Sequence, residues 1–441
     1  MSWEVIGPAA SELADLLDPR TLPAVKPPSF HEALRRIAHA RAALPMIYRE
    51  VLVEPLANSL LALGAERYHE HLAQPEGAPL WTLVDALLPY AGGSEQERNA
   101  TAAAQELISD IYDGFLSAED RRGFTSPELV IVPPLVAWES RGRGPVYFSA
   151  AQLAIANVHL GLVALPMRMR EAGLWAWPLL AHEVAGHDVL LANRNLLPEL
   201  ASRIYSRLYA AGLGDLAGYW ADRTHEAAAD ILGVLNIGPS LGISLIVLLA
   251  ALRQLNDGTP YLRSVDPGQS PYPLDILRAW AACETIGDLQ FSRAKGWRDW
   301  LVATIARDAR TIWIGGRMVS PARAWASARI VAREVARGRL GTLGNRSFAE
   351  LQNWHDSDQS LSDHLARWLR SGEPTPPRYG EGYYAAHAIA AVIQADLATV
   401  GTPAGAALRP KLTERALALC AAMHRENPVW RGAPLILPGD R

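Results

Sequence analysis

Residues 180–188 read Leu-Ala-His-Glu-Val-Ala-Gly-His-Asp and place His182, Glu183 and His187 within six positions. Neutral imidazole and carboxylate groups are the usual ligands of a catalytic zinc ion that keeps one position open for water. A glutamate directly after the first histidine is the usual base that deprotonates this water. The segment therefore predicts a helix that carries a zinc site and organises the surrounding fold.

The spacing of the two histidines is one residue longer than in the common H-E-x-x-H helix. At 3.6 residues per turn, positions i and i+4 lie about 40° apart, but i and i+5 lie about 140° apart. A single-turn π-bulge would absorb the extra residue, and such bulges often occur at functional sites. Gly186 lies inside the interval, where the lack of a Cβ atom eases the distortion. We therefore expect a bulged helix between His182 and His187.

Residues 182–187 match the H-E-x-x-G-H signature of the dipeptidyl peptidase III family, whose members are gluzincins, zinc peptidases with a glutamate as third ligand. Residues 224–230, Thr-His-Glu-Ala-Ala-Ala-Asp, resemble the second gluzincin helix with its E-x-x-x-D pattern. The resemblance covers roughly residues 175–235. It implies ligands His182, His187 and Glu226, the base Glu183, Asp230 as partner of a ligand histidine, and His225 beside the third ligand.

Both segments lie in apolar sequence. Trp175 to Ala181 precede the first motif, and Ile231 to Leu235 follow the second. Polar groups inside apolar helices need partners, and metal ligation would satisfy several of them at once. Two plainer interpretations stay open. The acids could lie on a solvated helix face, or the cluster could be a hydrogen-bonded core network without metal.

The composition is that of an ordinary globular protein, with 441 residues, 49% hydrophobic content and a net charge of −4. This charge gives no footprint for nucleic acid or an anionic membrane. Two distant cysteines, Cys283 and Cys420, fit reduced core thiols of a cytoplasmic protein. The start of the chain has no pattern of a targeting segment. The apolar stretch Leu241 to Leu252 is shorter than the roughly twenty residues of a membrane span, so we expect a buried helix.

Hydrophobic spacing predicts a mainly α fold (α+β), with helices over 29–73 and 97–117. Strands are expected over 128–138, 146–148 and 158–165, which would form a small sheet beside the zinc helix. We expect three regions, an N-terminal helical region, a zinc-site region with the sheet and both ligand helices, and a C-terminal helical region, at 1–125, 126–270 and 271–441.

Hydrolysis through a tetrahedral intermediate also needs a group that stabilises the oxyanion. The Gly/Pro-rich stretch 372–382 precedes Tyr383, Tyr384 and His387, and we expect one of these three to serve. The alternative is that they only pack at a helix start, in which case His225 is the next candidate.

These observations predict a cytoplasmic zinc-dependent peptidase that acts on a peptide or protein substrate. Two alternatives are a metal-binding or catalytically lost regulatory protein on the same scaffold, and a zinc hydrolase of a non-peptide amide. The sequence does not indicate cleavage preference or oligomeric state.

Overall fold

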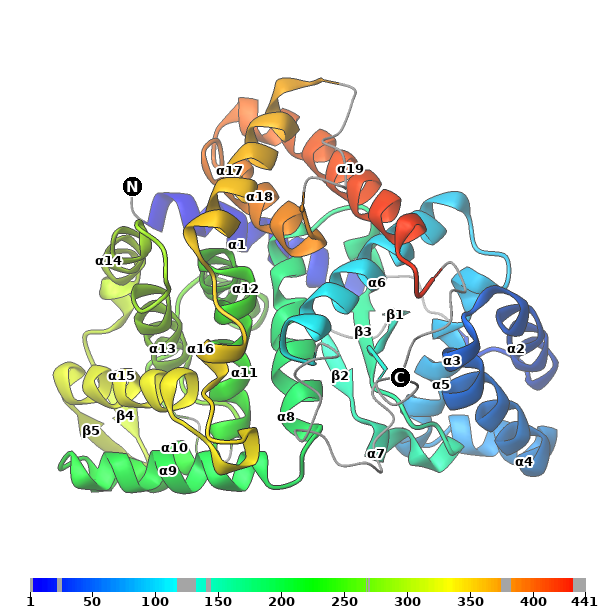
Figure 1. Ribbon diagram of the computed structural model, residues 1–441, viewed down its shortest axis with the longest axis horizontal. Coiled ribbons are helices and arrows are strands. Elements are labelled where there is room, and N and C mark those ends of the chain that lie inside the picture. Colours follow the sequence, from blue (N-terminus) through cyan, green and yellow to red (C-terminus); the bar gives the residue numbers. More distant parts are fainter. Residues whose placement is uncertain are drawn as a thin grey trace.

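The protein is described by a computed structural model that covers residues 3–21, 26–116, 132–139, 144–266, 268, 270–373 and 382–430. Most of these residues are helical, which confirms the predicted mainly α fold. Helices α8, α11 and α12 stand at the centre of Figure 1, with α2 to α5 on the right, α17 to α19 at the top, and α9 and α15 at the lower left.

The N-terminal third consists of helices joined by short turns. Their bounds are α1 (Trp3–Leu17), α2 (Phe30–Ala43), α3 (Met46–Tyr48), the π-helical segment η2 (Arg49–Val53), α4 (Glu54–Leu72), α5 (Ala78–Ala86) and α6 (Glu95–Leu116). These helices confirm the two helical ranges expected from hydrophobic spacing.

A three-stranded sheet follows, built from β1 (Leu135–Glu139), β2 (Val146–Phe148) and β3 (Leu162–Pro166) in the order β1-β3-β2. Strand β1 runs parallel to β3, with Leu135 opposite Leu162, and β2 runs antiparallel to β3. The strand predicted at 146–148 is confirmed. The third predicted strand begins later than expected, and residues 128–131 of the first lie outside the described part of the chain.

The rest of the chain is helical except for one hairpin, β4 (Ile312–Ile314) and β5 (Arg317–Val319). Its central elements are α7 (Ala150–Leu153), η7 (Leu174–Leu179), η8 (His182–Asp188), α8 (Val189–Leu191), α9 (Leu196–Ala210), α10 (Gly214–Ala221), α11 (Thr224–Ile237), α12 (Pro239–Asp257) and α13 (Asp275–Gly287). Its C-terminal helices are α14 (Ala294–Ile305), α15 (Pro321–Arg337), α16 (Phe348–Leu351), α17 (Asp356–Ser371), α18 (Ala385–Leu397) and α19 (Pro403–Glu426).

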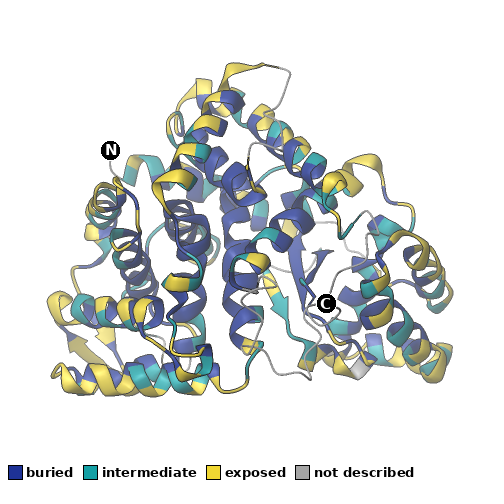
Figure 2. Ribbon diagram, in the orientation of Figure 1, coloured by how far each residue is buried: buried dark blue, intermediate teal, exposed yellow. Residues whose placement is uncertain are grey.

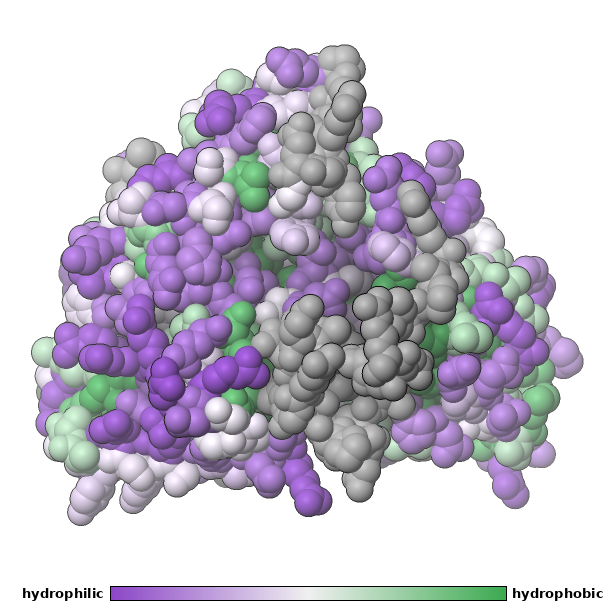
Figure 3. All heavy atoms as spheres, in the orientation of Figure 1, coloured by the Kyte–Doolittle hydropathy of each residue, from purple (hydrophilic) through white to green (hydrophobic). Residues whose placement is uncertain are grey.

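The largest hydrophobic cluster joins side chains from Ile6 to Met423, and a second cluster packs α2, α4 and α5 against the sheet. The dark central helices of Figure 2 belong to the first cluster. The visible surface is mostly hydrophilic, with scattered hydrophobic patches (Figure 3). The three predicted regions all contribute to the first cluster, and the division at 125 and 270 stays a prediction.

Helix α12 is longer than the apolar stretch expected at Leu241 to Leu252. Among the described residues it is the one helix long and apolar enough to cross a membrane by length and composition. However, 67% of its most apolar window is buried inside the protein. This burial is what a core helix requires, because α12 packs against α1, η7 and α11.

Candidate metal centre

The two histidines of the first motif lie on η8, which is a π-helix from His182 to Asp188. Hydrogen bonds from residue i to i+5 place residues five apart on the same face. The ring centroids of His182 and His187 are accordingly 4.8 Å apart, with planes nearly perpendicular. The bulge predicted from the spacing is therefore confirmed.

Gly186 has a different role from the one we expected. Its backbone is not in the left-handed region, so the π-helix does not require glycine for conformational reasons. Instead, a Cβ atom here would lie 2.2 Å from the Cβ of Ala229 on α11. Glycine thus allows η8 and α11 to approach closely, and this approach brings the two motifs together.

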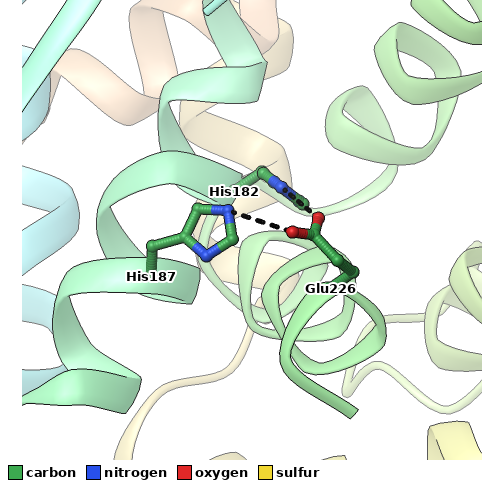
Figure 4. Close-up of side chains that lie close together, drawn as sticks. All are labelled: His182, His187 and Glu226. Carbon is green, nitrogen blue, oxygen red and sulfur yellow. Dashed lines mark ion pairs between the residues drawn. The ribbon is translucent and has the colours of Figure 1, made fainter. Parts of the chain in front are cut away.

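Helix α11 carries Glu226 toward the two histidines (Figure 4). Its Oε2 atom is 3.4 Å from His182 Nε2, and its Oε1 atom is 3.9 Å from His187 Nε2. One ligand atom from each of these three residues lies within 4.8 Å of the others. The structure therefore brings together the three predicted ligands, which are separated by up to 44 positions in the sequence.

The ring of His182 is held from behind by a buried carboxylate. Its Nδ1 atom lies 2.8 Å from Asp230 Oδ1, as predicted for Asp230. Asp230 in turn accepts two hydrogen bonds from Arg278 on α13, at 2.7 and 2.8 Å. We did not predict Arg278. Its one signal in the sequence is a lone arginine in the apolar run Ile276 to Ala282, where burial would require a counter-charge.

His187 is held by a different kind of partner. Its Nδ1 atom lies 2.8 Å from His225 Nε2, and its ring stacks against Tyr147 of β2. The Tyr147 hydroxyl donates a hydrogen bond to Asp188, the residue after His187. His225 therefore orients a ligand histidine, and Tyr147, which we did not predict, fixes the ring from the sheet side.

Burial and neighbouring charges shift the pKa values of the cluster. Burial is the largest influence on Glu183 and raises its pKa to about 7. Burial opposes the charged form of His182, but the carboxylates of Asp230 and Glu226 outweigh it and raise the pKa to about 10. For His187, burial and the nearby His182 lower the pKa to about 3. Glu226 is also buried, yet the contact with His182 holds its pKa down to about 2.

The cluster opens into a cavity of about 520 Å³, which we call the metal cavity. Its wall includes Glu183, whose Oε2 atom is 3.9 Å from His187 Nε2. The described lining comes from β2 and its flanks, η7, η8, α8, α11, α12 and α13. This volume falls within the roughly 300–1,000 Å³ of typical ligand sites, so the cavity has room for part of a substrate.

The donor set fits zinc. Zinc binds imidazole nitrogen and carboxylate oxygen at roughly 2.0–2.2 Å, so tetrahedral ligand atoms lie about 3.4 Å apart. The closest pair already has this separation, since His182 Nε2 and Glu226 Oε2 are 3.4 Å apart. Glu226 Oε2 is also buried without a hydrogen-bond partner. A buried carboxylate oxygen with no donor is costly, and a cation would satisfy it.

The three predicted oxyanion groups do not lie in the metal cavity. His387 Nδ1 accepts a hydrogen bond from the Tyr384 backbone N–H, and His387 Nε2 lies 3.1 Å from Asp358, so this histidine caps α18. The Tyr383 hydroxyl lies 3.0 Å from His364. Most of the Gly/Pro-rich stretch, residues 374–381, lies outside the described residues.

The described lining of the metal cavity offers other donors that could serve an oxyanion. They are Tyr147, His225, Tyr272 and Arg278. Comparisons with protein-family models, with curated proteins and with solved structures give no match to this chain.

Proposed function

We propose that this protein is a zinc-dependent hydrolase of peptide bonds, in which His182, His187 and Glu226 hold the ion and Glu183 is the general base. The observation that carries the proposal is the convergence of three ligand atoms within 4.8 Å of one another in one cavity. Two histidines and a glutamate are a ligand set of catalytic zinc, which leaves one position open.

The residues behind the cluster prepare the two imidazoles for this role. With each Nε2 directed to the ion, Nδ1 carries the proton and donates it in a hydrogen bond, from His182 to Asp230 and from His187 to His225 Nε2. Such partners fix the tautomer and the ring orientation of ligand histidines. Arg278 keeps Asp230 ionised and in place.

A zinc ion bound here would polarise the scissile carbonyl and lower the pKa of a water molecule. Glu183 lies at the wall of the same cavity and accepts the proton that the attacking water loses. The protonated carboxyl group then donates this proton to the departing amine nitrogen. General base and acid steps of this kind typically contribute about 10²- to 10⁴-fold to the rate.

Strand β2 supports a peptide as the substrate. It is an edge strand of the described sheet, and Val146 and Tyr147 line the metal cavity. An edge strand can pair with the extended backbone of a peptide. We place the reaction in the cytoplasm, where buried free thiols such as Cys283 and Cys420 stay reduced.

The test combines zinc analysis with digestion of a peptide library. We expect the purified protein to contain zinc and to cut peptides, and Glu183→Gln to keep the zinc and lose turnover, because an amide cannot accept the proton. The matched control is Glu66→Gln, an exposed glutamate on α4, which should behave as wild type.

Two results would contradict the proposal. Loss of zinc in Glu183→Gln would show that this residue is a ligand, and a zinc-loaded protein that cuts no peptide would exclude peptidase activity.

A further inference from the structure

Helix α12 presents a stripe of four leucines to the metal cavity. They are Leu245, Leu248, Leu249 and Leu252, at positions i, i+3, i+4 and i+7. This spacing places them on one helix face. Leu248 and Leu252 are half-buried, although most of α12 before them is fully buried. The stripe therefore forms an apolar wall that is partly open to the cavity.

The other apolar side chains around the cavity are unusually exposed. Val146 of β2 is 39% exposed, Leu191 of α8 is 40% exposed, and Tyr272 before α13 is 46% exposed, and all three line the cavity. Single exposed apolar residues are common, but a group of them around one concave site indicates a binding surface. These residues come from three separate elements, so the grouping is not a property of one amphipathic helix.

The polar groups of the cavity are confined to the cluster and its supports. Glu183, Glu226 and Arg278 come from η8, α11 and α13, whereas α12 contributes only leucines to the described lining. A substrate whose amide lies at the cluster would therefore place its neighbouring side chain in apolar surroundings. Burying such a side chain is favourable in proportion to the apolar area removed from water.

From this arrangement we infer that the leucine stripe of α12 binds a large apolar side chain, of leucine or phenylalanine type, on a residue that flanks the scissile bond. The inference rests on the proposed function, because the position of the scissile amide is defined by His182, His187 and Glu226. It makes Leu248 and Leu252 specificity-determining residues, and the substrate class is apolar peptides.

The test uses a matched pair of zinc-binding probes, N-acetylglycine hydroxamate and N-acetylleucine hydroxamate, and needs no turnover. Both carry the same chelating group, so their affinities for the zinc-loaded protein differ only through the isobutyl side chain. We expect the leucine probe to bind at least about tenfold more tightly, the lower end of what an apolar contact contributes to discrimination.

Two variants remove the apolar wall and one serves as a control. Leu248→Gln and Leu252→Gln should each reduce the preference to less than about threefold, because a buried amide without partners opposes the isobutyl group. Leu255→Gln should keep the full preference, since Leu255 is also half-buried on α12 but does not line the cavity. Zinc content and thermal unfolding of each variant show that the site and fold are intact. If Leu248→Gln fails to fold, Leu252→Gln decides.

The outcomes separate this inference from the proposed function. Equal affinity of wild type for the two probes, or an unchanged preference in both variants, would overturn the role of the stripe and leave the zinc site standing. Failure of both probes to bind, together with absence of zinc, would overturn the two proposals together. Cleavage of peptides without apolar preference would refute the inference alone.

Discussion

Two cavities of this protein contain a histidine beside a carboxylate, and they treat it in opposite ways. In the metal cavity, His182 and His187 each use Nδ1 for a protein partner and turn Nε2 toward Glu226. In the second cavity, of about 720 Å³, His387 has both ring nitrogens engaged, by the Tyr384 backbone and by Asp358.

The difference separates ligands from structural histidines. A buried polar atom needs a partner, and Glu226 Oε2 has none among the protein groups. The carboxylate of Asp358, in contrast, receives His387 and the backbone N–H of His355. We conclude that the first cluster is incomplete without an ion, whereas the second is a completed helix cap.

The largest expected effect follows from this contrast. His182→Ala, His187→Ala and Glu226→Ala should each weaken zinc binding by more than the roughly 10- to 100-fold that loss of a supporting partner costs. His387→Ala should keep its zinc and lose about 1 kcal/mol of stability, as for loss of a helix cap. Chelator competition and chemical denaturation measure the two quantities. Zinc loss in His387→Ala would place the ion in the wrong cavity.

A smaller effect concerns the carboxylates behind the histidines. Asp230→Asn leaves the buried guanidinium of Arg278 without its counter-charge, and we expect a loss of about 3–5 kcal/mol in the free energy of unfolding. Asp358→Asn removes a partly exposed hydrogen-bond partner, for which about 0.5–1.5 kcal/mol is expected. Equal losses in urea denaturation would mean that the two carboxylates are equivalent, contrary to the comparison.

Much of the metal centre was predictable because its determinants are local. The H-E-x-x-x-H spacing predicts the π-helix, and the apolar flanks predict that α11 is buried. Arg278 was not predicted because it reaches Asp230 across 48 positions, through the packing of α13 on α11. The reason for Gly186 was missed for the same cause, since its neighbour Ala229 is close only in the folded protein.

The prediction for the second cavity was wrong because its signal is ambiguous. A Gly/Pro-rich stretch before Tyr383, Tyr384 and His387 suits a loop over an active site. It equally suits the start of a helix, where His387 bonds back to the Tyr384 backbone N–H. Hydrogen-bonding potential alone cannot distinguish these roles, because both need the same donors and acceptors at the same positions.

Two glycines give a third, smaller test of the comparison. An alanine at Gly186 would overlap Ala229 of α11, at 2.2 Å, so η8 or α11 must move, and overpacking of this kind costs about 1–3 kcal/mol. An alanine at Gly114, in the second cavity, would meet only the side-chain ends of Asn236 and Gln352, at 3.2–3.3 Å. These can shift, so Gly114→Ala should be nearly neutral in thermal unfolding. Zinc affinity should fall in the first variant only.

The smallest expected effect is on turnover in Tyr383→Phe and Tyr384→Phe. If either hydroxyl stabilised the oxyanion, its removal would lower kcat by about 100- to 1,000-fold with little change in KM. The structure directs the Tyr383 hydroxyl to His364, and Tyr384 lines the second cavity, so neither hydroxyl reaches the metal cavity. We therefore expect kcat within about twofold of wild type, measured on a peptide from the library digest with zinc content matched. A loss of 100-fold or more in one of them would mean that the two cavities act on one substrate, and the separation between a metal site and a helix cap would fail.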